Sequence, residues 1–148
     1  MSRPHGSITR RIYSRPVRVV PLLAVLALLA AGCGARSSAP FTATATAPCL
    51  KKQGFTRVTT GAAVPFIARF AENGGLVGTA PDGNAVTIAF AASPDEVDST
   101  GKAFRKSAPP ILKAHFSDVL RSNRNAVIVW TTSPSDDDTS AVNGCLAP

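Results

Sequence analysis

The chain has 148 residues, of which 45% are hydrophobic and 17% are charged, with 3 cysteines and a formal charge of +7. This length is enough for one domain at most. The charge is uneven, because the first 18 residues hold five arginines and no acid, whereas the chain from Cys33 onward carries 11 basic and 9 acidic side chains. We therefore expect no nucleic-acid partner, although the high overall pI alone would suggest one.

An uncharged apolar run of 14 residues, 19–32, follows Arg18 and ends in small residues. A basic segment before such a run is typical of a secretory signal peptide. The run is shorter than the roughly 17 to 25 residues that span a bilayer. Residues 1–32 are thus expected to direct export. Arg10 and Arg11 resemble a twin-arginine signal, but the strongly hydrophobic run and Tyr13, where phenylalanine is commoner, favour the ordinary route for unfolded chains.

The sequence Leu29-Ala30-Ala31-Gly32-Cys33 resembles the lipobox of bacterial lipoproteins. It departs from that pattern at Ala30, where leucine is commoner. The resemblance implies cleavage before Cys33 and lipidation of the Cys33 thiol, which would hold the protein at the extracytoplasmic face of a cell membrane. The alternative is an ordinary secreted protein that is cleaved near Ala31.

Residues 33–48 comprise Cys33 and a segment rich in alanine, serine, threonine and proline, so we predict a flexible tether here. The folded domain is then expected to cover residues 49–148. Cys49 and Cys145 bracket this domain, and in an exported chain they are expected to form a disulfide. Two free buried thiols are the alternative.

In the first half of the domain, residues 49–53 predict a short helical turn and residues 55–60 a strand. A helix is predicted over 65–73, from its initial proline and from apolar residues four apart. Strands over 76–80 and 85–92 flank the turn residues Pro81-Asp82-Gly83-Asn84 and predict a hairpin.

In the second half, Ser93-Pro94-Asp95-Glu96 predicts the start of a helix that Pro109 and Pro110 interrupt. Apolar residues over 111–120 predict a second amphipathic helix. Residues 126–132 predict a central strand, because they are apolar on both faces. A last helix is predicted from Ser133 onward, with acidic residues in its first turn.

This order of elements predicts an α+β domain. We expect a small antiparallel or mixed sheet of about four strands with helices packed on one face, and a ferredoxin-like arrangement is one form of it.

Candidate residues for chemistry are few. His115 could act as a general base, but no G-x-S-x-G motif accompanies it, so a packing role beside the apolar stripe is favoured. Asp136, Asp137 and Asp138 are expected to cap a helix, since the calcium-loop pattern is absent. Trp130 is expected in the core, and residues 74–78 lack the pattern of a phosphate loop. We predict no catalytic, cofactor-binding or metal-binding residue.

The function expected from these features is that of a lipid-anchored extracytoplasmic binding or envelope-interaction domain. Its partner would be the membrane, through the anchor, together with an envelope protein or a small ligand. Two alternatives stay open: a small surface hydrolase that uses His115, and a structural accessory subunit of a membrane complex.

Overall fold

The computed structural model describes residues 39–147, which contain a five-stranded antiparallel sheet in the order β1-β2-β3-β5-β4. The strands are β1 (Thr56–Thr60), β2 (Gly75–Thr79), β3 (Ala85–Phe90), β4 (Leu120–Asn123) and β5 (Ala126–Trp130). The α+β class predicted from the sequence is confirmed. The sheet has five strands, one more than expected.

Strands β2 and β3 form the predicted hairpin, and β5 pairs with both β3 and β4, as its apolar sequence predicts for a central strand. Val86, Ile88 and Phe90 alternate along β3 with Thr87 and Ala89. Since successive side chains of a strand point to opposite faces, β3 presents one bulky face and one face of smaller residues. Helices can therefore approach the sheet more closely on the face with the smaller residues than on the bulky face.

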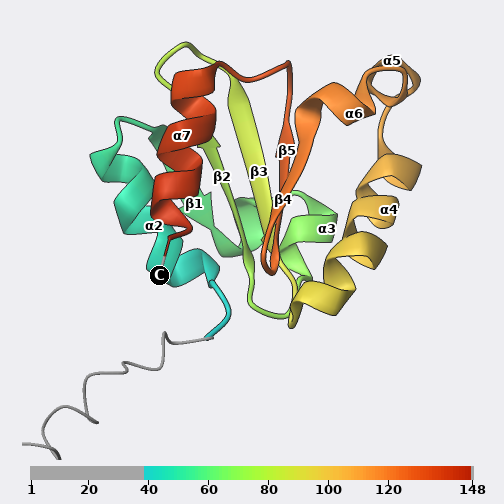
Figure 1. Ribbon diagram of the computed structural model, residues 1–148, viewed down its shortest axis with the longest axis horizontal. Helices are drawn as coiled ribbons and strands as arrows, with labels where there is room; N and C mark the ends of the chain where they lie inside the picture. The colour runs from blue at the N-terminus through green and yellow to red at the C-terminus, as the bar shows by residue number, and fades with distance from the viewer. Residues whose placement is uncertain (1–38, 148) are drawn as a thin grey trace, which may run out of the picture. The chain divides into compact units, whose positions relative to one another are not determined.

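Helices cover both faces of the sheet, which corrects the prediction that they pack on one (Figure 1). α2 (Ala43–Lys52) and α7 (Asp136–Cys145) lie side by side on the bulky face, and α3 (Phe66–Arg69) and α4 (Val97–Ser107) lie on the other. Gly75 of β2 allows α3 to come this close, because a Cβ at that position would collide with the backbone of Ala68. The expected one-sided sandwich is therefore a three-layer structure.

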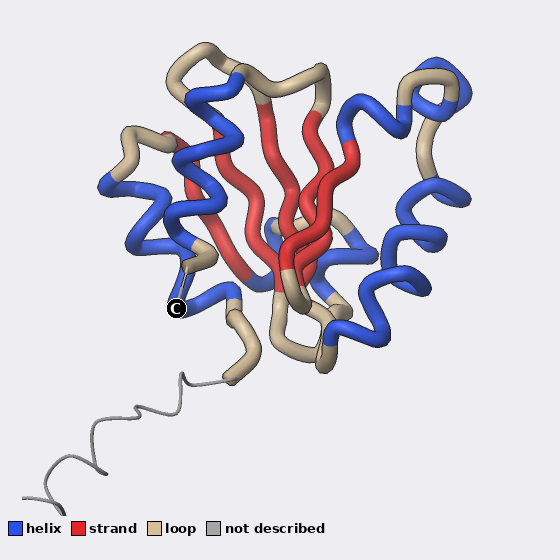
Figure 2. The backbone as a smooth tube through the Cα atoms, in the orientation of Figure 1, coloured by secondary structure: helices blue, strands red, loops and turns tan. Residues whose placement is uncertain are grey.

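The ferredoxin-like arrangement is also ruled out. That fold contains a split β-α-β unit, in which another strand lies between the two strands that a helix connects. Here β1 and β2 are direct neighbours in the sheet, although 3₁₀ helix η1 (Gly61–Ala63) and α3 connect them. Figure 2 shows the resulting layout, with the strands enclosed by helices and joined by loops at both ends of the sheet.

The predicted tether is wrong from Phe41 onward, since the folded domain begins well before Cys49. α2 starts at Ala43, where the Thr42 Oγ1 accepts a hydrogen bond from the Ala45 N–H at 3.2 Å. Ala43 and Thr46 are buried, and the Ala43 N–H donates to the Asn73 carbonyl. This segment has the composition of a linker, but its tertiary contacts stabilise it as a helix.

Asn125 holds the chain just before α2. Its Oδ1 accepts from the Phe41 N–H at 2.8 Å, and its Nδ2 donates to the Phe41 carbonyl at 2.9 Å and to the Ala91 carbonyl at 2.9 Å. The neighbouring Arg124 lies over the Phe41 ring, 4.5 Å from its centroid. The chain therefore enters the domain beside Ala91, at the end of the sheet where the β4–β5 turn lies.

The helix predicted over 111–120 is divided into shorter elements. 3₁₀ helix η2 (Pro94–Glu96) leads into α4, and two four-residue helices follow, α5 (Pro110–Lys113) and α6 (Phe116–Val119). Leu120 then begins β4, which pairs with β5 through a turn where Arg124 takes a left-handed φ of 53°. Pairing with β5, rather than any pattern in Arg121-Ser122-Asn123, places these residues in the sheet.

Candidate functional site

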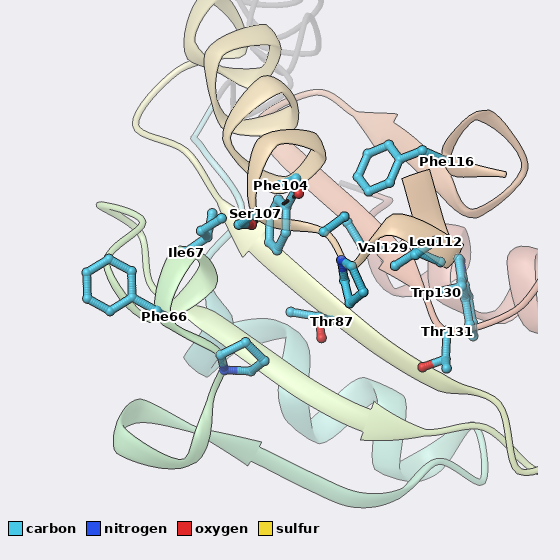
Figure 3. Close-up of a pocket in the computed structure, with 13 residues that line it drawn as sticks. Phe66, Ile67, Thr87, Phe104, Ser107, Leu112, Phe116, Val129, Trp130 and Thr131 are labelled. Atoms are coloured by element: carbon cyan, nitrogen blue, oxygen red, sulfur yellow. Dashed lines mark hydrogen bonds between the residues drawn. The ribbon is translucent and has the colours of Figure 1, made fainter. Parts of the chain in front are cut away.

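An apolar cavity lies between α3 and α4, on the face of the sheet with the smaller residues (Figure 3). Its volume is about 390 Å³, within the range of small-molecule sites. Thr87 and Val129, paired across β3 and β5, form its floor. The walls come from both helices and from the segment that follows α4: Pro65, Phe66, Ile67, Phe104, Ser107, Ala108, Pro109, Leu112 and Phe116.

The lining of this cavity is apolar. Three hydroxyl side chains interrupt it, those of Thr87, Ser107 and Thr131, and no lining residue is charged. Backbone groups of the floor are committed to the ladder between β3 and β5. An extended peptide would leave its own N–H and C=O groups unpaired here, whereas an apolar chain carries none. The cavity thus suits an apolar ligand.

A second cavity, of about 300 Å³, adjoins the first at Ile67, whose side chain lines both. Phe70 and Ala103 continue the apolar wall. Unlike the first cavity, this one carries two carboxylates, those of Glu72 and Glu96. We call the two cavities together the α3–α4 furrow. Its first cavity is apolar, whereas its second cavity adds the hydroxyl groups of Ser99 and Thr100 to the two carboxylates.

Three large hydrophobic side chains of the described domain are exposed to solvent: Phe66 by 70%, Phe70 by 68% and Ile111 by 84%. Phe66 and Phe70 border the furrow from α3, with ring centroids 4.7 Å apart and the Arg69 guanidinium over both rings. Ile111 instead lines a third cavity, which shares Leu112 and Thr131 with the first. Exposed apolar side chains gathered at one groove are typical of a binding surface.

His115 lines the same third cavity, of about 470 Å³, which shares Leu112 and Thr131 with the first. Its other lining residues are Ile111, Asp118, Val119, Thr132 and Ser133. Its Nδ1 lies 3.7 Å from Asp118 Oδ2, and its side chain is 72% exposed. Within residues 39–147 the imidazole makes no hydrogen bond to a hydroxyl group. His115 thus shares its cavity with the apolar residues Ile111, Leu112 and Val119, but its ring is largely exposed and not packed as expected. The ring also lacks the contact with a nucleophile that a general base needs.

The three aspartates at the start of α7 differ from one another in burial. Ser135 caps the helix, since its side chain accepts from the Asp138 N–H at 3.1 Å, but Asp138 itself is only 5% exposed. Its Oδ2 has no hydrogen-bond partner. Burial raises the pKa of Asp138, and the nearby carboxylate of Asp82 raises it further, whereas a hydrogen bond from Ser135 lowers it. No group of three or more metal-ligating side chains occurs in the described domain.

The two cysteines of the domain lie at disulfide distance. Their sulfur atoms are 2.07 Å apart and their Cα atoms 5.6 Å apart, and they join α2 to the last residue of α7. Cys33, the predicted lipidation site, and the signal peptide lie outside the described residues. Trp130 is in the core as predicted, 1% exposed and against Phe55.

Sequence reasoning missed the furrow. The spacing of Phe66 and Phe70 predicts two buried residues on one helix face, but α3 has only four residues and buries Ala68 instead. One signal in the sequence was available, namely the smaller side chains Thr87 and Ala89 on one face of β3. Small side chains on a sheet leave space beneath the helices that cover it, and Thr87 lies at the floor of the cavity.

Comparison with known proteins gave no match to a protein-family model, to a curated protein or to a solved structure. Within residues 39–147, no helix has the length and apolar character that a membrane span requires.

Proposed function

We propose that the protein is a lipoprotein held by lipid on Cys33 at the extracytoplasmic face of a cell membrane. Support comes from the basic segment, the apolar run and the small residues directly before Cys33. Two or three acyl chains give stable anchoring, whereas a single chain does not. Five residues, 34–38, separate Cys33 from Ala39, where the described domain begins, so the anchor would keep the domain within roughly 20 Å of the lipid surface.

We further propose that the anchored domain binds an apolar ligand or partner group in the α3–α4 furrow. The observation that carries this proposal is that the exposed Phe66 and Phe70 both line this one groove, whose first cavity is apolar. Exposing such side chains has no benefit for folding, since burial of each would stabilise the domain by about 1.5 to 3 kcal/mol. Transfer of this surface out of water on binding supplies the affinity.

The sheet edges support this choice of site. β1 carries a bulge, with Arg57 at a φ of 52°, and Arg121 of β4 turns its guanidinium back onto the carbonyls of Ser117 and Leu120. Bulges and charged side chains are the means by which edge strands avoid pairing with other chains. We therefore place partner binding at the furrow and not at an edge.

A surface hydrolase that uses His115 is the weaker proposal. Asp118 could orient the imidazole, and Thr132 and Ser133 line the same cavity. The ring is largely exposed, however, so its surroundings resemble water more than a preorganised site. The role of a structural accessory subunit would require the same apolar contacts as the binding proposal.

Photolabelling of the mature protein in phosphatidylcholine vesicles tests the binding proposal, with octanol that carries a diazirine in its chain as the probe. Labelled peptides are expected from α3, α4 and the segment around Leu112. Ser107→Phe should fill the cavity from an exposed helical position and reduce labelling about tenfold. Ser140→Phe, at an exposed position of α7 on the opposite face, is the matched control and should leave labelling unchanged. Equal labelling of the two variants would refute binding in the furrow.

A further inference from the structure

The distribution of charge along the α3–α4 furrow is one-sided. Among the residues that line its two cavities, the charged side chains are Glu72 and Glu96, and both belong to the second cavity. Glu72 follows α3, and Glu96 ends η2 directly before α4. The two carboxylates thus come from the elements that form the two walls, at the same end of the furrow.

The basic side chains of the two helices are not among the residues that line either cavity: Arg69 of α3, and Lys102, Arg105 and Lys106 of α4. Arg69 donates from Nη1 to the Ala62 carbonyl at 3.3 Å while its guanidinium lies over the phenylalanine rings. Lys102 pairs with Asp98 at 2.9 Å. The Arg105 guanidinium lies over the ring of Phe116, 5.0 Å from its centroid. Glu72 and Glu96 therefore have no basic residue facing them within the lining.

We infer that the furrow binds a single-chain amphiphilic amine, with its apolar chain over Thr87 and Val129 and its ammonium group at Glu72 and Glu96. This inference rests on the proposed binding function and adds the chemistry of the ligand. An apolar chain fits the uncharged cavity without leaving polar groups unpaired. The ammonium group supplies the opposite charge at the only charged part of the lining.

The acidic end of the furrow lies near the point where the described chain enters the domain. Ala91 lines the acidic end of the furrow, and its carbonyl accepts from Asn125, the residue that holds Phe41. The acidic end therefore lies beside the segment that comes from Cys33.

The experiment compares three diazirine-bearing probes of equal chain length on the mature protein in phosphatidylcholine vesicles: octylammonium, octanol and octanoate. Furrow peptides should be labelled about three to ten times more strongly by octylammonium than by octanol, and least by octanoate, as expected for one or two partly exposed ion pairs. Added salt should remove the preference and leave octanol labelling unchanged.

Glu72→Gln combined with Glu96→Gln should make the three probes equal, whereas Asp95→Gln combined with Asp98→Gln removes two acids outside the lining and should keep the preference. Equal labelling by all three probes in the wild type would overturn the inference while the octanol result still supports an apolar site. Stronger labelling from a diazirine phospholipid in the vesicles than from octylammonium would also overturn it. If octanol does not label the furrow, the binding function itself fails.

Discussion

Asn125 binds the main chain of Phe41 at both of its polar groups, with hydrogen bonds of 2.8 and 2.9 Å across 84 positions of sequence. Asn125→Ala should remove these bonds and leave the Phe41 N–H and C=O without those partners. The free energy of unfolding should fall by about 1 to 3 kcal/mol, and the Phe41 amide should exchange faster with solvent. Urea denaturation and hydrogen exchange measure the two effects. Unchanged exchange at Phe41 would show that Asn125 does not hold the start of the domain.

The link between Cys49 and Cys145 is expected to stabilise the domain strongly, because the two positions are 96 residues apart. Closing a loop of this size contributes on the order of 4 to 5 kcal/mol in the chain-entropy model. Replacing both cysteines with serine should lower the free energy of unfolding by up to that amount. Adding reductant to the wild type should have a similar effect and leave the double variant unchanged. Ready alkylation of both thiols in the native, unreduced protein would contradict this prediction.

Asp138→Asn should stabilise the domain at neutral pH. Burial and the Asp82 carboxylate raise the pKa of Asp138 above 3.8, so the folded protein holds this proton more tightly than the unfolded chain does. The contribution of Asp138 to stability is then complete below the unfolded pKa and is lost as the pH rises through the folded pKa. An asparagine carries no charge and avoids that loss.

Chemical denaturation of Asp138→Asn between pH 3 and pH 8 should show a weaker decline in stability with rising pH than the wild type. Asp136→Asn is the matched control, since Asp136 is exposed in the same first turn and favours the helix dipole. It should destabilise the domain slightly. A larger stability gain from Asp136→Asn than from Asp138→Asn would be inconsistent with the role of burial.

The sequence predicts well where local patterns agree with tertiary contacts. The turn Pro81-Asp82-Gly83-Asn84 and the alternation along β3 predict the β2–β3 hairpin correctly. The apolar run of β5 correctly predicts that β5 is a central strand. β4 and the first half of α2 were missed, because pairing with β5 and the hydrogen bonds to Asn73 and Asn125 stabilise them. The furrow was also missed because tertiary contacts determine it. α3 has only four residues and packs Ala68 against the sheet, which leaves Phe66 exposed.

His115→Gln is expected to change stability by less than about 0.5 kcal/mol, as is usual for an exposed position, and to leave binding in the furrow unchanged. The side chain is exposed, and its contact with Asp118 is long at 3.7 Å. Thermal unfolding and octanol photolabelling measure both effects, with Asp118→Asn as the companion variant. Loss of a measured hydrolase activity in His115→Gln, with the fold intact, would place the enzyme proposal first.

The identity of the mature N-terminus tests the central claim, lipid anchoring of the domain through Cys33, most directly. Mass spectrometry of the protein extracted from membranes should find a first residue of Cys33 that carries acyl chains, and Cys33→Ser should accumulate as uncleaved or mislocalised precursor. An unmodified N-terminus at another residue, or a Cys33→Ser protein that still fractionates with membranes at the mature size, would contradict the account.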